Sequence, residues 1–594
     1  MNQMKYKSEH QSELEQYNQN MTIKFKNKIQ NGELQIQRNG KLTTLEFLNQ
    51  LKIQKLQLIQ CENIIPQLTS STIKELTIQY CKIQNIDGFQ LENLEILDAS
   101  DNKEMKNCSF ETFKQLKQLD ISRTDRMDIS NLMLPQLKIL NLRNNKINDL
   151  MQLSNLVNLE ELNLSRNKGT NINPLQQMKQ LRILNLSECK LESVKVLESL
   201  TNLGDLDVSG NEDIDLSSIQ YLINLKKLNI SRTNINNIDV LKSLNNLEEL
   251  NISWNIITDI NVLNYFVNLT YLNLIQTKVQ NIEILLQLKH LKELDLSYNP
   301  NIDFQPLQQM VQLQKLSLRC NKLRNISYLS GLINLEYLNL SSNENLEKTS
   351  LQYFVSLTSL NIKYCKIDDI SSLKTLVGLE VLDISSNNIN NIDHLKNLVK
   401  LRDLNISYNC VKVISVLKQF KCLKKLCISR NIGVNITPLQ YLTQLTFLEA
   451  YYCDLYEISV LRPLVNLEYL DISDNELFYF YPIRDLDAEI YVPYNLIAES
   501  SDYFTFFDVI DKQQLINRRP NEQQIFFAGK MKAIDSSTQN IRDTNSSRKN
   551  YLSKKQIVKD TFIYLKQKQH EMLLSLTNKA VQLFLLLDGQ EDYQ

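Results

Sequence analysis

Leucine recurs along the chain at a fixed interval. From Leu137 to Leu467 a new repeat begins with leucine every 22 residues, and weaker copies extend the series upstream to Ile53. The shared form is L-x-x-L-x-L-x-x-N/C-x-L, and about twenty copies cover residues 53–488. This regularity predicts an array of stacked repeats in which each repeat mainly contacts its neighbours.

Within one repeat the spacing of the apolar residues changes once. In the repeat that begins at Leu247, Leu250 and Ile252 alternate with polar neighbours, which predicts a short strand. From Ile257 to Phe266 the apolar residues lie three apart, at positions 11, 14, 17 and 20, which predicts a tight 3₁₀ return on the outer side. A single repeat cannot bury these side chains, so neighbouring repeats must share one continuous core.

Position 9 of the repeat is polar although apolar positions flank it. It is asparagine in twelve of the eighteen repeats from Leu94 onward, as at Asn145, Asn255 and Asn475, and threonine or cysteine in the others. We expect the inward amide to hydrogen-bond backbone groups at the bend where the strand ends. Position 9 is therefore predicted to form a buried polar ladder along the array.

The cysteines follow the same repeat. No C-x-x-C pair occurs among the ten cysteines, which argues against a zinc site or a disulfide framework. Cysteines that replace asparagine in this buried ladder are expected to be reduced thiols. Five of the ten occupy position 9: Cys61, Cys81, Cys189, Cys365 and Cys453.

The tripeptide Asn251-Ile252-Ser253 matches the N-x-[ST] acceptor for N-linked sugar, and the same pattern recurs in several repeats. Position 5 nevertheless accepts aspartate, as at Asp207 and Asp295, and position 7 is serine in thirteen of eighteen repeats. Glycosylation requires asparagine, and sugars on strands about 5 Å apart would crowd one surface. We therefore interpret the tripeptide as a coincidence of two columns that face outward on the concave sheet.

Composition excludes several classes of protein. The 594 residues carry 66 basic and 67 acidic side chains, so the whole chain has no bias toward nucleic acid or membrane surfaces. The polar N-terminal stretch has no apolar segment typical of a signal peptide, and the densest apolar run, Leu583 to Leu587, is far too short to span a membrane. We expect a cytoplasmic protein without a membrane span.

The full pattern L-x-x-L-x-L-x-x-N-x-I-x-x-I-x-x-L-x-x-L resembles the 22-residue subclass of leucine-rich repeats. A regulatory subunit of protein phosphatase 1 typifies that subclass, and bacterial internalins share it. The resemblance covers residues 53–488 and implies an α/β leucine-rich repeat solenoid. It implies a right-handed curved superhelix with a parallel concave β-sheet, short 3₁₀ or α segments on the convex side, and protein binding on the concave face.

Candidate binding residues are the aromatic side chains of the concave columns. Positions 3, 5, 7 and 8 should face the concave side. Because positions 5 and 7 are nearly uniform, the residues that distinguish one partner from another should lie at positions 3 and 8. Exposed aromatic residues anchor many interfaces, although aromatic residues in strands also pack sideways on neighbouring rungs. We predict partner contacts at Trp254, Tyr271, Tyr298, Tyr337, Tyr364, Tyr408, Phe447, Tyr452 and Tyr469.

The two ends of the chain depart from the repeat. Residues 33–37 alternate as a short strand within the N-terminal cap, and Tyr and Phe accumulate after residue 488 to cover the last repeat. The predicted organisation is a disordered polar N-terminus (1–20), an N-terminal cap (21–52), the array (53–488), an aromatic C-terminal cap (489–534), a linker (535–550) and an amphipathic helix (551–588).

The C-terminal segment is locally basic. Residues 530–570 hold ten Lys or Arg against three Asp or Glu. This charge suits an anionic surface or a calmodulin-type target, and it equally suits the solvated face of a helix that packs on the array or on a second copy. We favour the second interpretation, in which the helix packs on the array or mediates a second contact or self-association.

The sequence holds no catalytic signature. The four histidines lack metal-ligand spacing, and none of the phosphate-loop, dinucleotide or nucleophile-elbow motifs occurs. We therefore predict a non-catalytic scaffold or regulatory subunit that binds a protein, with no cofactor, no metal and no nucleic acid. The resemblance adds a phosphatase-regulatory role. An internalin-like cell-surface adhesin is the alternative, and it predicts export or glycans.

Overall fold

In this computed structural model, the described residues are 21–492 with the exception of 40, 41, 43, 63, 107, 126, 131, 478 and 479. The chain divides into two compact units, Met1–Ala498 and Glu499–Gln594. Only the first unit contains described residues. The predicted disordered N-terminus, the linker, the amphipathic helix and most of the aromatic cap lie outside the described part of the chain.

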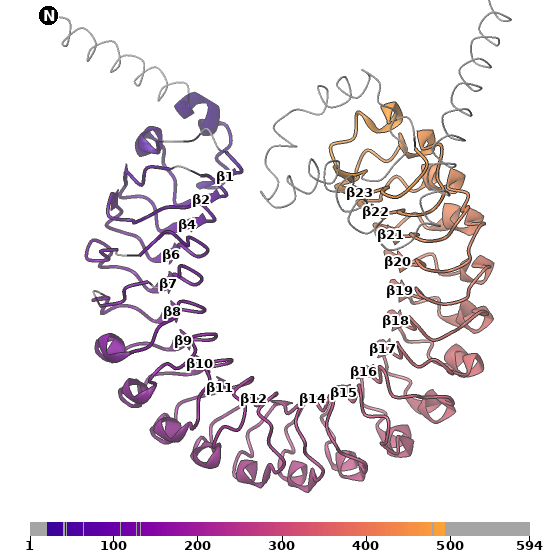
Figure 1. Ribbon diagram of the computed structural model, residues 1–594, viewed down its shortest axis with the longest axis horizontal. Coiled ribbons are helices and arrows are strands. Elements are labelled where there is room, and N and C mark those ends of the chain that lie inside the picture. Colours follow the sequence, from indigo (N-terminus) through magenta and orange to yellow (C-terminus); the bar gives the residue numbers. More distant parts are fainter. Residues whose placement is uncertain are drawn as a thin grey trace, which may run out of the picture. The chain divides into compact units, whose positions relative to one another are not determined.

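The strands of successive repeats form one parallel sheet of 22 strands, which lines the inner side of the curved array (Figure 1). Each strand pairs with the strand of the next repeat, and most strands cover positions 3 to 5. The strands of this sheet are β1 (Glu33–Gln37), β2 (Lys55–Ile59), β4 (Glu75–Gln79), β6 (Ile96–Asp98), β7 (Gln118–Asp120), β8 (Ile139–Asn141), β9 (Glu161–Asn163), β10 (Ile183–Asn185), β11 (Asp205–Asp207), β12 (Lys227–Asn229), β13 (Glu249–Asn251), β14 (Tyr271–Asn273), β15 (Glu293–Asp295), β16 (Lys315–Ser317), β17 (Tyr337–Asn339), β18 (Ser359–Asn361), β19 (Val381–Asp383), β20 (Asp403–Asn405), β21 (Lys425–Cys427), β22 (Phe447–Glu449), β23 (Tyr469–Asp471) and β24 (Glu489–Tyr491).

Short 3₁₀ helices return the chain along the outer side (Figure 1). A two-stranded parallel sheet of β3 (Leu68–Thr69) and β5 (Phe89–Gln90) occurs among the shorter first repeats. The 3₁₀ helices are η1 (Glu46–Gln50), η2 (Met151–Asn155), η3 (Asn173–Gln177), η4 (Lys195–Ser199), η5 (Ser217–Tyr221), η6 (Asp239–Leu241), η7 (Asn261–Tyr265), η8 (Glu283–Gln287), η9 (Gln305–Gln309), η10 (Ser327–Gly331), η11 (Lys348–Tyr353), η12 (Ser371–Thr375), η13 (Asp393–Leu395), η14 (Ser415–Gln419), η15 (Thr437–Tyr441), η16 (Ser459–Leu461) and η17 (Tyr481–Ile483).

The core lies between these two layers, as the apolar spacing predicts. In the repeat that begins at Leu247, the side chains of Leu250, Ile252, Leu263 and Phe266 are fully buried. Each buried side chain of this kind stabilises the fold by about 1.5–3 kcal/mol. Because every repeat contributes the same set, the array has one continuous hydrophobic core, and the leucine-rich repeat solenoid is the observed fold.

The asparagine ladder at position 9 is also confirmed. The Asn255 carboxamide oxygen accepts hydrogen bonds from the backbone N–H groups of Thr233 (3.1 Å) and Ile235 (3.2 Å) in the preceding repeat. Its Nδ2 donates to the carbonyls of Ile230 (2.9 Å) and Ile252 (3.1 Å). One buried side chain thus satisfies backbone groups of two repeats at the bend where the sheet ladder stops.

Three further polar columns have structural roles. The Asn281 carboxamide oxygen accepts a hydrogen bond from the Glu283 N–H (2.8 Å) at the start of η8, at position 13 of its repeat. The Asn246 Nδ2 donates to the carbonyl of Ile223 (2.9 Å), at position 22. Position 5, described below, is the third. The roles of positions 13 and 22 were not predicted from the sequence, although both explain part of the asparagine content.

Both ends of the array continue one strand beyond the predicted boundaries. Strand β1 has the bounds predicted for the short N-terminal strand, and it pairs in parallel with β2, so the cap contributes the first rung of the sheet. Strand β24 lies in the segment assigned to the C-terminal cap and pairs in parallel with β23. Among the described residues, no helix is long and apolar enough to cross a bilayer.

Candidate partner-binding surface on the concave face

Position 5 and position 7 act together at the end of each strand. The Asn251 side-chain oxygen accepts hydrogen bonds from both the N–H (3.1 Å) and the Oγ (2.7 Å) of Ser253. Asp207 accepts the same pair from Ser209, at 2.9 and 2.6 Å. The column therefore requires an acceptor oxygen, which both Asn and Asp supply. The N-x-[ST] tripeptide is a strand-end turn.

This turn corrects the prediction that position 7 serines face the concave surface. Ser253 is buried, because its hydroxyl is turned back onto position 5. Where position 7 is not serine, the side chain does reach the surface, as with Arg319 and Tyr451. Residues other than serine at position 7 therefore indicate concave surface residues in the sequence. They were not among the predicted binding residues.

Position 8 has a left-handed backbone in every repeat from Leu94 to Leu467. Trp254 has φ of 59° and Tyr298 of 61°, and Gly210 is the single glycine of the column. A left-handed conformation costs a residue with Cβ roughly 1–2 kcal/mol. The array thus carries this backbone cost in nearly every repeat, whichever side chain stands at position 8.

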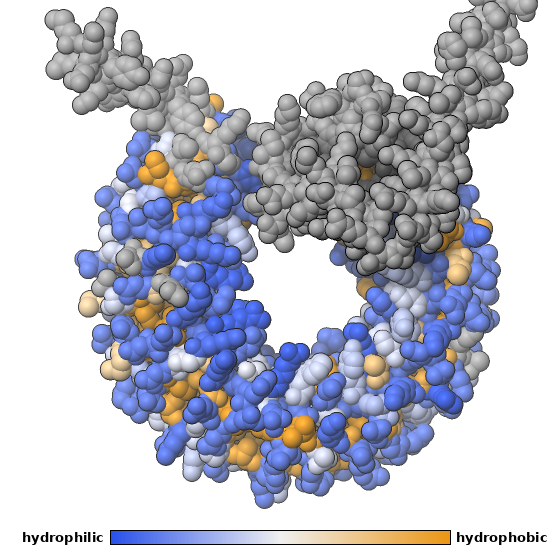
Figure 2. All heavy atoms as spheres, viewed as in Figure 1, coloured by the Kyte–Doolittle hydropathy of each residue, from blue (hydrophilic) through white to orange (hydrophobic). Residues whose placement is uncertain are grey.

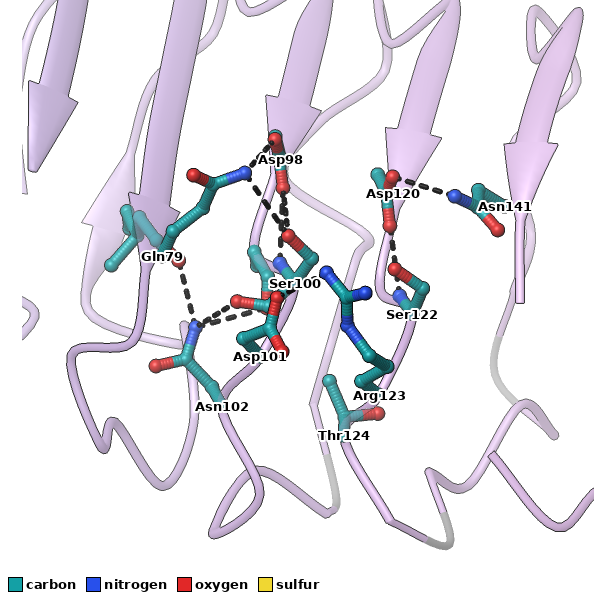
Figure 3. Close-up of polar contacts among 12 residues, drawn as sticks. Gln79, Asp98, Ser100, Asp101, Asn102, Asp120, Ser122, Arg123, Thr124 and Asn141 are labelled. Atoms are coloured by element: carbon teal, nitrogen blue, oxygen red, sulfur yellow. Dashed lines mark hydrogen bonds and ion pairs between the residues drawn. The ribbon is translucent and has the colours of Figure 1, made fainter. Parts of the chain in front are cut away.

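The first repeats carry a polar network on the concave sheet, which we call the N-terminal polar network (Figure 3). It comprises Gln79, Asp98, Asp101, Asp120, Arg123 and Asn141. The Gln79 Nε2 donates to the Asp98 carboxylate (2.7 Å), and the Asn141 Nδ2 donates to the Asp120 carboxylate (2.7 Å). The Arg123 guanidinium pairs with the Asp101 carboxylate at 2.5 Å. Polar groups on neighbouring rungs thus satisfy one another.

A different arrangement lies between β12 and β16, and we call it the Trp254 patch: Arg232, Trp254, Tyr298 and Arg319. The centroids of the Trp254 and Tyr298 rings lie 6.3 Å apart, although one whole repeat lies between the repeats that carry them. The Arg232 guanidinium lies 4.8 Å from the indole centre, and the Arg319 guanidinium lies 5.4 Å from the Tyr298 ring centre. Trp254 remains 41% exposed. The patch is an open row of two rings flanked by two cations.

A second group, the Arg430 cage, consists of Tyr408, Arg430, Tyr451 and Tyr452. The Arg430 guanidinium lies 5.3, 5.9 and 4.5 Å from the centres of the Tyr408, Tyr451 and Tyr452 rings. The Tyr451 hydroxyl donates to the Tyr408 hydroxyl. Burial and this contact raise the pKa of Tyr451 to about 12. The structure therefore joins two predicted residues to Tyr451, which was missed.

A third group stacks three rings near the C-terminal end of the sheet. Phe447 and Tyr469 lie parallel with centroids 4.5 Å apart, and Tyr491 lies 5.2 Å from Tyr469. Burial is the main cause that raises the pKa of Tyr469. Tyr491 was missed because its strand, β24, was assigned to the cap.

The structure does not bring the other three predicted residues into these groups. Tyr271 and Tyr337 are partly buried within the sheet, and burial raises the pKa of each hydroxyl. Tyr364 is 51% exposed and has no ring neighbour among the residues that the structure describes. Hydrophilic residues cover most of the inner rim in the view of Figure 2. The aromatic groups are therefore local features on a polar surface.

No metal-binding cluster of three or more His, Cys, Asp or Glu side chains occurs among the described residues. All ten cysteines are free, and the five at position 9 are buried. The Cys189 Sγ, for example, donates to the carbonyl of Leu164 (3.2 Å), as asparagine does elsewhere in the ladder. The described surface thus offers stacking and ionic contacts.

Comparison with known proteins finds one matching family model and several similar solved structures. The model of a leucine-rich repeat family matches residues 243–260 and 287–303. No curated protein matches the sequence. An internalin, InlF, from Listeria monocytogenes is similar at 24% identity, over 58% of this chain and 89% of its own, with a TM-score of 0.40.

Two further solved structures are similar. A leucine-rich repeat protein from Leptospira interrogans matches at 25% identity, over 59% of this chain and 95% of its own, with a TM-score of 0.47. The repeat ectodomain of a plant membrane receptor kinase, GASSHO1/SCHENGEN3 from Arabidopsis thaliana, matches at 21% identity, over 76% of this chain and 56% of its own, with a TM-score of 0.45. The repeat geometry and the matching family model together identify the chain as a leucine-rich repeat protein.

Proposed function

We propose that the chain is a non-catalytic scaffold or regulatory subunit that binds a protein partner on its concave face. The observation that carries this proposal is the Trp254 patch. Its rings and guanidinium groups belong to the residue types that dominate binding energy at interfaces. They lie in the tight bends that directly follow strands of a continuous sheet, so little ordering is needed when a partner arrives.

The chain offers a matched control for this patch on the outer layer of the array. Tyr265 is 41% exposed, as Trp254 is, and the Lys242 ammonium lies 4.9 Å from its ring centre. Tyr441 is 45% exposed on η15. Both lie on the outer layer, so the same loss of exposed aromatic area there should leave concave binding intact.

The test is affinity capture from lysate of the source organism, followed by quantitative mass spectrometry. The full chain and the Tyr265→Ala/Tyr441→Ala control should retain the same proteins, and the Trp254→Ala/Tyr298→Ala variant should lose at least one of them. Equal retention by all three chains would contradict the proposal.

A cytoplasmic phosphatase-regulatory role is the finer form of the proposal. It rests on the resemblance of the 22-residue repeat to that of a protein phosphatase 1 regulatory subunit. The retained proteins should then include a phosphatase catalytic subunit, detected by hydrolysis of a phosphopeptide. The adhesin alternative instead predicts glycans at Asn251, which peptide mass spectrometry of the native protein detects. Against it, the same position of other repeats is aspartate, as at Asp207 and Asp295, which cannot carry such a glycan.

A further inference from the structure

Charges on the concave sheet around the Trp254 patch are mostly neutralised in place. The Glu249 carboxylate pairs with the Lys227 ammonium at 2.7 Å, and the Glu293 carboxylate pairs with the Lys315 ammonium at 2.7 Å. Asp295 accepts the N–H of its own strand-end turn. These acidic residues at positions 3 and 5 therefore have ion-pair or hydrogen-bond partners within the array.

The two arginines of the patch differ from these groups. Both are exposed, and within the described part of the chain neither Arg232 nor Arg319 has a carboxylate within 4.0 Å. Arg166, at the same position 8 as Arg232, pairs with the Glu188 carboxylate at 3.0 Å. The difference lies in the neighbour, because in the patch each guanidinium lies over an aromatic ring.

A ring neutralises a guanidinium less than a carboxylate does. Stacking engages the flat face of the guanidinium, and its N–H groups point outward in the plane. These donors match the two oxygens of a carboxylate, with which they form short, charge-assisted hydrogen bonds. The patch thus offers an aromatic surface with a guanidinium edge at each end that can bind a carboxylate. We call each of these edges, on Arg232 and Arg319, a fork.

The distance between the two forks limits what can reach both. The contacts from Arg232 through Trp254 and Tyr298 to Arg319 keep the guanidinium carbons within about 17 Å of each other. An extended peptide rises about 3.3 Å per residue. Two acidic side chains about five residues apart therefore span the patch.

We propose that the Trp254 patch recognises an extended acidic segment of the partner protein, with one carboxylate on Arg232, one on Arg319, and the residues between them on the two rings. This inference rests on the proposed function and specifies its partner. Half-buried carboxylates on the same face, at Asp205, Asp295 and Asp403, disfavour a continuous polyanion such as a nucleic acid. A peptide places its negative charge at two points, whereas a polyanion would carry charge along the whole face.

The first test uses the single tryptophan of the full chain. An uncompensated cation beside Trp254 should concentrate anions there, so iodide should quench its fluorescence at least about twofold more strongly than caesium ion. The Arg232→Gln/Arg319→Gln variant should lose most of this preference. Arg143→Gln/Arg166→Gln is the control, because it removes two arginines from the same two columns far from Trp254. Equal quenching by both ions in the unaltered chain, or an unchanged preference in the first variant, overturns the inference.

The second test identifies the ligand chemistry. Random displayed peptides of about twelve residues are selected on the full chain and counter-selected on the Trp254→Ala/Tyr298→Ala variant. The enriched peptides should carry Asp or Glu about five residues apart, and the Arg232→Gln/Arg319→Gln variant should bind them at least about tenfold more weakly. The Arg143→Gln/Arg166→Gln control should bind them unchanged.

The outcomes separate the two proposals. Site-specific peptides without acidic residues would overturn this inference and leave the proposed function standing. If no peptide binds the full chain more tightly than the Trp254→Ala/Tyr298→Ala variant, both the proposed function and this inference are contradicted. A single-stranded oligonucleotide that binds the full chain more tightly than the acidic peptides would overturn the choice of a protein ligand.

Discussion

The N-terminal polar network and the Trp254 patch both use position 8 on the concave side of the same array, yet their side chains there do opposite things. Arg123 and Arg232 both stand at position 8 with a left-handed backbone. The Arg123 guanidinium meets a carboxylate on the neighbouring rung, whereas the Arg232 guanidinium meets an aromatic ring. The first region is satisfied internally, and the second leaves donors and ring surface open.

The difference teaches which positions build the array and which can serve binding. Positions 4, 6 and 9 have the same roles in both regions, so a change there should weaken either region equally. Position 8, and position 7 where it is not serine, face outward and vary, so a change there should affect binding in one region alone. Four predictions follow this division.

The largest expected effect is on stability and should be the same in both regions. The Nδ2 of Asn102 donates to the carbonyls of Ile78 (2.7 Å) and Ala99 (2.9 Å), as the Nδ2 of Asn255 does in its own repeat. Replacement by Asp removes the donor and buries a carboxylate against carbonyl oxygens, so Asn102→Asp and Asn255→Asp should each cost about 3 kcal/mol. Urea denaturation monitored by circular dichroism measures both. A large loss in only one region would contradict the shared role of the ladder.

The second effect separates the two regions. Trp254→Ala/Tyr298→Ala should weaken binding of the captured partner by about 30-fold, near 2 kcal/mol, because both rings leave the contact. Asp101→Ala/Arg123→Ala should change it less than about threefold, because the Arg123 guanidinium is already paired with the Asp101 carboxylate. Isothermal titration calorimetry distinguishes the two. Similar losses in both variants would mean that the whole face contributes uniformly.

The third effect concerns the backbone of position 8. Ser386 has φ of 55°, so Ser386→Gly should stabilise the array by about 1 kcal/mol. Gly210 has φ of 67°, and a Cβ there would lie 3.0 Å from the Glu188 Cγ, so Gly210→Ala should destabilise by about 1 kcal/mol. Opposite shifts in the urea midpoint are expected. Shifts of the same sign would refute the left-handed strain.

The smallest effect is predicted for position 5. Asn251 uses its side-chain oxygen as acceptor in the turn, and aspartate supplies the same oxygen. Asn251→Asp should therefore change stability by less than about 0.5 kcal/mol, although it is the same substitution as Asn255→Asp four residues later. A loss close to that of Asn255→Asp would show that the turn needs the amide donor.

Sequence spacing was sufficient for the layers, the core and the ladder, because those depend on contacts that recur in every repeat. It failed where the outcome depends on one neighbour. The Trp254 and Tyr298 rings meet across the repeat that contains Gln276, and the residue types at position 8 do not indicate this contact. Arg319 and Tyr451 were hidden in a column interpreted as uniform. The N-terminal cap and β24 were assigned as covers, but each adds a strand because parallel pairing continues where the leucine pattern weakens.

The central claim is that Trp254 stands on an open surface that a protein partner covers. Since the chain has a single tryptophan, acrylamide quenching of its fluorescence reports on this site alone. The account predicts strong quenching in the free chain, and protection with a shift of the emission to shorter wavelength once the captured partner is bound. A tryptophan shielded from acrylamide in the free chain, or equally accessible in the complex, would contradict it.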